Sequence, residues 1–156
     1  EKIIRYLWEK SFVIRTCGLY GHAGSSGKGG NFIETMLQKA KAHDSIRVVH
    51  DQVLTPTSTR ELARKVAQLI QTEHYGLYHV TSQGACSWYE FAAAVFEFVG
   101  IKADLSPTTS AEFKSPARRP AFSVMENAHL KKRGMDDLKS WQDALLEYIS
   151  TRRSKS

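Results

Sequence analysis

Short runs of apolar residues alternate along the chain with longer stretches in which apolar residues recur every three or four positions. The short runs are rich in β-branched and aromatic residues, which favour buried strands, and they cover residues 12–14, 46–49 and 77–81. The longer stretches are typical of amphipathic helices. Three of them follow the candidate caps Asn31, Ser58 and Ser87, and a last helix is expected from about Ser140 to Ile149. Strands that alternate with helices in this way predict an α/β fold with parallel pairing.

The segment 76–92 contains the clearest of these units. The run from Leu77 to Thr81 predicts a buried strand, and the polar and glycine residues at 82–84 end it. Ser87 and Glu90 have the spacing of a capping box, which predicts the start of a helix. The same spacing predicts a capping box at Ser58 and Glu61. Because ligands of α/β sheets tend to bind at the carboxyl ends of strands, we expect a ligand-facing edge here.

Weaker signals predict further elements near both ends of the chain. Residues 1–9 place four apolar side chains on one helical face and predict the end of a helix. Leu105 belongs to a short edge strand that is expected to stop before Pro107. Thr109 and Glu112 have the spacing to cap a short helical turn. The irregular pattern of this region predicts a small lobe beside the sheet.

The 156-residue chain is long enough for one domain, which we expect over residues 1–150, with a basic, disordered tail at 151–156. Its net charge is +6, and its sequence pI is near 9.4. A basic balance favours an anionic partner such as a nucleotide or a phosphorylated metabolite. The clusters at 131–133 and 152–155 are interpreted as solvated surface, so nucleic acid is not an expected partner. If the tail did bind nucleic acid, binding would weaken steeply with salt.

No apolar run approaches the roughly 20 residues that a membrane-spanning helix needs, and no signal-peptide pattern opens the chain. We therefore expect a reduced, cytoplasmic setting and no membrane partner. Cys17 and Cys86 form no CxxC pair, and the sequence leaves a single disulfide open. The six histidines show no i, i+4 pair, so no metal site is expected.

A glycine-rich loop at 17–30 separates the first strand from the next helix. A strand, a glycine loop and a helix N-terminus together can hold phosphate on backbone N–H groups. The P-loop pattern fails because His22 replaces its first glycine and Gly29 replaces its Ser or Thr. The GxGxxG pattern fails because Phe32 replaces its last glycine. The loop is therefore either an anion site or flexible surface.

Arg118 and Arg119 lie between two prolines, which stiffen the backbone around them. Arginine binds phosphate bidentately, so a pyrophosphate is one candidate partner, and a salt bridge that ties the small lobe to the sheet is the alternative. Asp51 and Gln52 directly follow a strand, in a loop predicted at 50–56, where they are placed either to bind a ligand or to form loop hydrogen bonds. The favoured interpretation is that Asp51 orders this loop. The sequence has no G-x-S-x-G elbow, no paired carboxylates and no neighbouring Cys and His, so we assign no catalytic residue.

Six motifs occur in an order and at spacings that resemble one family. They are Arg15-Thr16…Leu19-Tyr20-Gly21, Asn31-Phe32 with Thr35-Met36-Leu37, Asp51-Gln52…Pro56-Thr57, Gly76-Leu77-Tyr78-His79, Ser87-Trp88-Tyr89-Glu90-Phe91-Ala92 and Ala117-Arg118-Arg119-Pro120. Together they resemble the C-terminal half of dTDP-4-dehydrorhamnose reductase, an extended short-chain dehydrogenase. The resemblance covers about residues 1–150.

The resemblance implies the C-terminal part of a Rossmann-like, doubly wound sheet with a small sugar-nucleotide-binding lobe. The family reduces the 4-keto group of dTDP-4-dehydro-L-rhamnose with NADPH or NADH, the last step of dTDP-L-rhamnose synthesis, and a Tyr-x-x-x-Lys tyrosine supplies the proton. Glu1 resembles the glutamate that follows that motif, so the resemblance implies that the cofactor glycines and the catalytic pair precede residue 1. The chain alone is then expected to be inactive.

The resemblance also implies site residues. Cys17, Gly18 and Leu19 would lie beside the nicotinamide, and Gly18, Asn31, Arg118 and Arg119 would lie beside the dTDP-sugar substrate. Gly18 stands where close relatives carry a tryptophan against the sugar. A non-catalytic binding or regulatory module of the same family is the alternative. Because the missing half of the sheet would leave an apolar edge, we also expect a homodimer.

Overall fold

A computed structural model describes residues 1–23, 30–113 and 119–152. The described helices are α1 (Lys2–Leu7), α2 (Phe32–Lys41), α3 (Thr59–Leu69), α4 (Trp88–Val99), α5 (Ser110–Phe113), α6 (Ala128–Lys132) and α7 (Trp141–Thr151). The described strands are β1 (Phe12–Arg15), β2 (Leu19–Tyr20), β3 (Ile46–Val49), β4 (Val53–Leu54), β5 (Thr57–Ser58), β6 (Gly76–His79), β7 (Cys86–Ser87) and β8 (Leu105–Thr108). The predicted α/β fold is confirmed.

Parallel pairing dominates the described strands. β1 pairs with β6 in the register Phe12 to Gly76, and β3 pairs with β8 in the register Ile46 to Leu105. The short strands β2 and β5 are also parallel, whereas β4 and β7 are antiparallel. The long intervals between paired strands are what parallel pairing requires, because each return crosses over through a helix or a loop.

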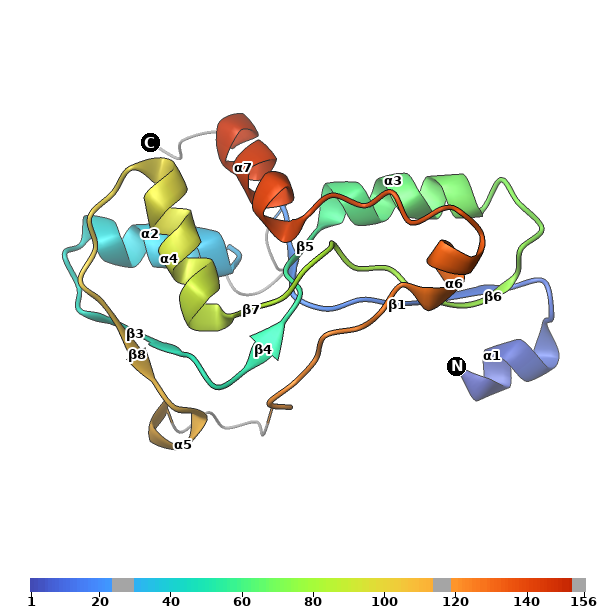
Figure 1. Ribbon diagram of the computed structural model, residues 1–156, viewed down its shortest axis with the longest axis horizontal. Coiled ribbons are helices and arrows are strands. Elements are labelled where there is room, and N and C mark those ends of the chain that lie inside the picture. Colours follow the sequence, from blue (N-terminus) through green and yellow to red (C-terminus); the bar gives the residue numbers. More distant parts are fainter. Residues whose placement is uncertain (24–29, 114–118, 153–156) are drawn as a thin grey trace.

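The elements form two groups that lie side by side (Figure 1). One group packs α2 and α4 near the β3–β8 pair and α7 against α4, around a core that includes Ile33, Phe91 and Leu145. The other packs α3 and α6 near the β1–β6 pair, around a core that includes Leu69, Tyr78 and Leu130. Each of these six side chains is fully buried.

The predicted caps Asn31, Ser58 and Ser87 each start a helix, and Ser140 caps the last one. Asn31, Ser87 and Ser140 each accept a backbone N–H at the start of their helix, and Ser87 and Glu90 form the complete capping box. The capping box predicted at Ser58 and Glu61 is wrong. Ser58 accepts from the backbone N–H of Arg60, and the Glu61 carboxylate instead accepts hydrogen bonds from Arg64 and from the backbone N–H of Lys139.

Two predictions near the small lobe need correction. β8 continues through Pro107 to Thr108, where the sequence suggested a stop before the proline. Among the described strands β8 pairs with β3 alone, and a proline is tolerated on such an edge. The loop predicted at 50–56 contains β4, which pairs with β7. The turn of helix at Thr109 is confirmed, since its hydroxyl group accepts the backbone N–H of Glu112.

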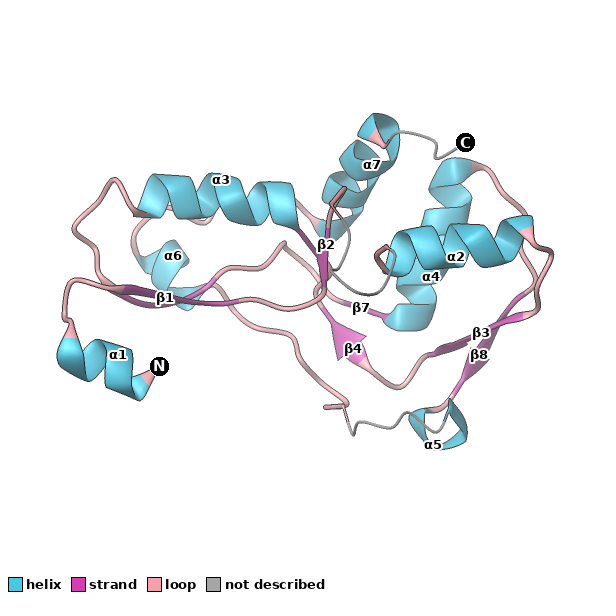
Figure 2. Cartoon of the chain, turned by 180° about the vertical axis from the view of Figure 1, so that it is seen from behind, coloured by secondary structure: helices cyan, strands magenta, loops and turns pink. Residues whose placement is uncertain are grey.

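Helix α1 packs little against the rest of the chain. It lies on the opposite side of the β1–β6 pair from α3 (Figure 2). None of its residues is buried, and the side chains of Ile3, Tyr6 and Leu7 are 74%, 87% and 71% exposed. The first helix therefore presents apolar surface that the described residues do not cover. Within the described residues no helix is long and apolar enough to cross a membrane.

Candidate functional site

The loop after β1 carries three of the residues implied by the family resemblance. The Cys17 thiol donates a hydrogen bond to the carbonyl of Thr55 over 3.2 Å, and the Gly18 carbonyl accepts the N–H of Thr57. Burial raises the pKa of Cys17 above its usual value, which keeps the thiol protonated near neutral pH. The Cys17 thiol is therefore held by the backbone of Thr55, and both cysteines are free thiols.

Gly18 has a conformation and surroundings that exclude a side chain. Its φ is +59°, and a Cβ atom would lie 2.8 Å from both Leu54 Cδ1 and the Thr55 carbonyl oxygen. A tryptophan at this position, as the resemblance implies for close relatives, would require a different path for residues 54–56. Gly18 can meet a ligand only through its backbone, whereas the neighbouring Leu19 is 49% exposed.

Two buried hydroxyl groups lie at the carboxyl ends of neighbouring strands. Thr16 follows β1 and Ser82 comes shortly after β6. The hydroxyl oxygens of both residues are buried and have no hydrogen-bond partner among the described residues. Because leaving a buried hydroxyl unpaired costs about 1–3 kcal/mol, this edge of the sheet is a place where a polar ligand group would gain stabilisation.

Asn31 is committed to the start of α2. Its Oδ1 accepts the N–H of Glu34 at 3.1 Å, and its Nδ2 donates to the Gly21 carbonyl at 2.8 Å and to the Tyr148 hydroxyl at 2.9 Å. These bonds use both amide hydrogens and one lone pair. The structure therefore places Asn31 as a helix cap that joins three segments, beside the cavity described next.

A cavity of about 410 Å³ lies between α2, β3, α4 and α5. Such a volume is within the range of small-ligand sites. The apolar lining residues are Phe32, Met36, Ile46, Val48, Val49, Trp88 and Phe113. The rings of Phe32 and Trp88 lie 4.7 Å apart, tilted by 45°. The walls therefore offer aromatic surface to a flat, apolar group.

Cationic side chains complete the lining. Lys39, Arg47 and Arg119 all contribute, and none of the described lining residues is acidic. The Arg47 guanidinium donates to Glu112 and Thr108, so its charge is partly neutralised. Hydrogen bonds from Thr108 first, and then from Arg47, hold the pKa of Glu112 below its usual value. An anionic group would meet Lys39 and Arg119 without a competing carboxylate on the wall.

Arg119 is the residue of the predicted arginine pair that the structure brings to this cavity, and Arg118 lies outside the described residues. Sequence reasoning did not assign Phe32, Lys39, Arg47 and Trp88 to a site. The aromatic pair shared the helical spacing of core residues, and the two cations looked like ordinary surface. Only the packing of α2 and α4 against β3 shows that they converge.

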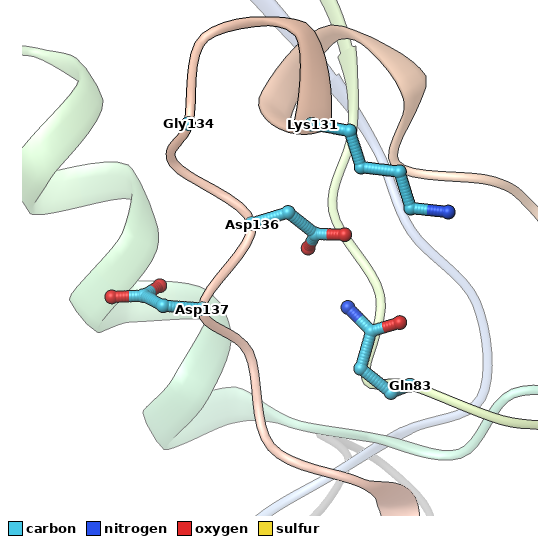
Figure 3. A pocket seen from close by; sticks show the side chains of 5 residues that line it. All are labelled: Gln83, Lys131, Gly134, Asp136 and Asp137. Atoms are coloured by element: carbon cyan, nitrogen blue, oxygen red, sulfur yellow. The ribbon is translucent and has the colours of Figure 1, made fainter.

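A second, more open cavity of about 470 Å³ is lined by Gln83, Lys131, Gly134, Asp136 and Asp137 (Figure 3). Its charged side chains already have hydrogen-bond or ion-pair partners within the chain. Asp136 accepts from Asn127 at 2.9 Å, Lys131 pairs with Glu126, and Asp137, which points toward α3 in Figure 3, pairs with Arg64 and Lys65. This cavity is a weaker candidate for a charged ligand than the first.

The spacing Tyr-x-x-x-Lys does occur in the chain, at Tyr6 and Lys10, although the sequence argument placed the family's pair before residue 1. The structure gives these two residues no catalytic arrangement. α1 ends at Leu7, Trp8 is extended, and Tyr6 is 87% exposed. The Tyr6 and Lys10 side chains therefore do not share one helical face. Among the described residues, no group of three His, Cys, Asp or Glu side chains could hold a metal ion. Asp51 orders its loop, as predicted, by accepting the N–H and hydroxyl of Ser110.

Comparison with known proteins identifies the family. The family described as the RmlD substrate binding domain matches residues 1–154. The chain belongs to this family. This RmlD substrate binding domain is 40% identical to the spore coat polysaccharide biosynthesis protein SpsK of Bacillus subtilis, over 99% of the chain and 52% of that protein. It is 33% identical to a dTDP-4-dehydrorhamnose reductase of Streptomyces griseus, over 93% of the chain and 48% of that protein.

Solved structures agree. A dTDP-4-dehydrorhamnose reductase from Clostridium acetobutylicum matches 96% of this RmlD substrate binding domain with 42% identity and a TM-score of 0.87, over 51% of that chain. The dTDP-4-dehydrorhamnose reductase of Bacillus anthracis, solved in complex with NADP, has 34% identity and a TM-score of 0.88, over 96% of this chain and 51% of that chain. The domain thus spans about half the length of the curated relatives it matches. The resemblance seen in the six motifs is confirmed.

The residues after β1 fit one part of a nicotinamide cofactor. The buried, unpaired hydroxyl groups of Thr16 and Ser82 can hydrogen-bond to a polar group brought to this edge. Leu19 offers exposed apolar surface beside them. The GxGxxG pattern that binds the pyrophosphate of such a cofactor does not occur in the sequence. Residues other than those of this sequence pattern would have to bind the pyrophosphate.

Proposed function

We propose that this chain supplies the sugar-nucleotide-binding part of an NAD(P)H-dependent dTDP-4-dehydrorhamnose reductase. The observation that carries the proposal is the cavity of about 410 Å³, which combines a Phe32–Trp88 wall with three cationic lining residues. A thymidine diphosphate has the matching chemistry, because it joins a flat base to two charged phosphates. The relatives are named dTDP-4-dehydrorhamnose reductases, and these names indicate the sugar that the nucleotide would carry.

Each part of the cavity has a role in this proposal. The base packs against the aromatic wall of Phe32 and Trp88, which offers apolar and π surface. The phosphates meet Lys39 and Arg119, and arginine can bind phosphate with two parallel hydrogen bonds. Asn31 holds the start of α2, and with it Phe32, in place. Arg118 stays a proposed second phosphate ligand on the strength of the motif it shares with Arg119.

NADPH or NADH would supply the hydride when it is bound. Cys17, Gly18 and Leu19, with the free hydroxyl groups of Thr16 and Ser82, would contact its nicotinamide end. For the proton, two of the described tyrosines, Tyr20 and Tyr148, are poorly suited donors. Burial raises the pKa of Tyr20, and burial is also the main cause that raises the pKa of Tyr148. We therefore expect the proton donor to lie outside this chain, and the chain alone to be inactive.

Titration calorimetry with dTDP and with thymidine tests this proposal. We expect the chain to bind dTDP more tightly than thymidine, because only dTDP brings phosphates to the cations. Lys39→Ala and Arg119→Ala should each weaken dTDP binding roughly tenfold, since one charged hydrogen bond contributes about 1.5 kcal/mol. Thymidine binding should change little. Lys131→Ala, in the second cavity, is the matched control and should leave both affinities unchanged.

A reductase assay tests whether this chain alone can carry out the reduction. With dTDP-4-dehydrorhamnose, the pure chain should bind the sugar nucleotide without oxidising NADPH. Steady oxidation would show that the chain itself carries a proton donor, contrary to the proposal. Reading the coding sequence upstream of Glu1 distinguishes the non-catalytic module. A Tyr-x-x-x-Lys and cofactor glycines in the same reading frame support the reductase, and a start codon near residue 1 supports the module.

A further inference from the structure

The end of α7 is tied to the start of α2 through one tyrosine. The Tyr148 hydroxyl group accepts a hydrogen bond from Asn31 Nδ2 and donates one to Glu34 Oε1, each over 2.9 Å. These partners lie more than 110 residues away in sequence. Since Asn31 caps α2 and Glu34 belongs to its first turn, Tyr148 holds the two groups that define where this helix begins.

Arg152 strengthens the same connection. Its Nη2 lies 3.0 Å from Glu34 Oε2 and its Nε lies 3.2 Å from Glu34 Oε1, so the two oxygens of one carboxylate are bound by one guanidinium. The side chains are only 16% and 17% exposed. A two-point contact of this kind fixes geometry more strongly than a single exposed ion pair.

The other side of α2 forms one wall of the cavity. Phe32, Thr35, Met36 and Lys39 line it, at positions that share a helical face. Thr35 also donates its hydroxyl hydrogen to the Asn31 carbonyl at 3.0 Å. The residues that Tyr148 and Arg152 hold are therefore in the same helical turns as the residues that face the cavity. A shift of the first turn would move Phe32 and Thr35 together.

We propose that Tyr148 and Arg152 are positioning residues for the nucleotide cavity, which they control through the start of α2 without touching the ligand. This inference rests on the proposed function of that cavity. The ring of Tyr148 has separate packing partners, Tyr20 at 5.4 Å and His22 stacked at 4.6 Å. Removing the hydroxyl group therefore tests the connection while leaving the packing in place.

Calorimetry with dTDP on the full chain tests the inference. Tyr148→Phe should weaken dTDP binding roughly three- to tenfold while the circular dichroism spectrum stays unchanged. The measurement is made well below the melting temperature, where a purely structural loss would not change the affinity of the folded protein. Tyr75→Phe is the matched control, because the Tyr75 ring packs on Phe12 at the opposite group of elements. It should bind dTDP as the wild type does.

Conservative rescue provides the second readout. Arg152→Gln should lose affinity, and Arg152→Lys should recover part of it, because lysine keeps the charge but not the two-point contact. Normal affinity in both Tyr148→Phe and Arg152→Gln, with a wild type that binds dTDP, would overturn this inference alone. A wild type that does not bind dTDP would overturn the proposed function and this inference with it.

Discussion

The ammonium group of Lys65 on α3 forms an ion pair with the carboxylate of Asp137, although the Lys65 side chain is only 1% exposed. Gln68 Oε1 accepts a second hydrogen bond from Lys65 at 2.6 Å. Arg64 also donates to Asp137, at 3.1 Å, which ties the segment before α7 to α3. A buried ammonium group requires such partners, since its desolvation is not otherwise offset.

We expect Asp137→Asn to destabilise the protein by about 2 kcal/mol, because it leaves the buried Lys65 charge with one neutral partner. Urea unfolding followed by circular dichroism measures this change. Asp104→Asn, at an exposed aspartate that forms no ion pair within the described part of the chain, is the control. An equal midpoint for wild type and Asp137→Asn would contradict the importance of the pair.

The same pair predicts a pH dependence. Hydrogen bonds from Arg64, and next from Lys65, lower the pKa of Asp137 to about 2. The folded state thus holds this carboxylate deprotonated more strongly than the unfolded state does. Its contribution to stability is complete above pH 4, and it is lost as the pH falls from about 4 to about 2.

Unfolding free energies measured between pH 5 and pH 2 test this dependence. The wild type should lose stability more steeply than Asp137→Asn across this interval, so that the two curves converge at low pH. Parallel curves would show that Asp137 does not carry the effect.

Gly18 provides a backbone test of the loop after β1. We expect Gly18→Ala to destabilise the protein by more than Gly134→Ala. Both glycines have positive φ, +59° and +65°, which costs alanine about 1 kcal/mol. Only at Gly18 would the new Cβ lie within 3 Å of other atoms, whereas nothing lies within 4 Å at Gly134. Equal urea midpoints for the two variants would contradict the crowding seen at Gly18.

The exposed helix α1 predicts self-association. Its apolar side chains, together with Trp8 at 65% exposure, form a surface that a second copy can cover. We expect light scattering to show a dimer whose population rises with protein concentration, and Leu7→Ser to reduce it. Lys2→Ser is the control for a change in helix composition alone. A monomer at every concentration would contradict this prediction.

Much of the fold follows from local sequence. The cap at Ser87, the apolar spacing of Phe91 and Val95, and the short run at 76–79 each specify their element without distant partners. The two-residue strands could not be predicted, because Val53–Leu54 is a strand only through its pairing with Cys86–Ser87. α6 was also missed, since its five residues carry a single buried position, Leu130.

The site was less predictable than the fold. Arg119 could be proposed because its motif is recognisable, but Lys39 and Arg47 carry no local signal of their own. Trp88 has the helical spacing of a packing residue, and the structure places it half-buried on the cavity wall. Side chains that converge from α2, β3 and α4 become a site only after those elements pack.

The most direct test of the central claim uses the three tryptophans as reporters in a nitrogen-15 NMR titration with dTDP. Trp88 lines the proposed nucleotide cavity, Trp8 follows the distant helix α1, and Trp141 is buried in the core. We predict that the indole N–H signal of Trp88 moves and saturates while that of Trp8 stays in place. A Trp88 signal that does not move at saturating dTDP, or movement confined to Trp8, would contradict the claim that this cavity binds the nucleotide.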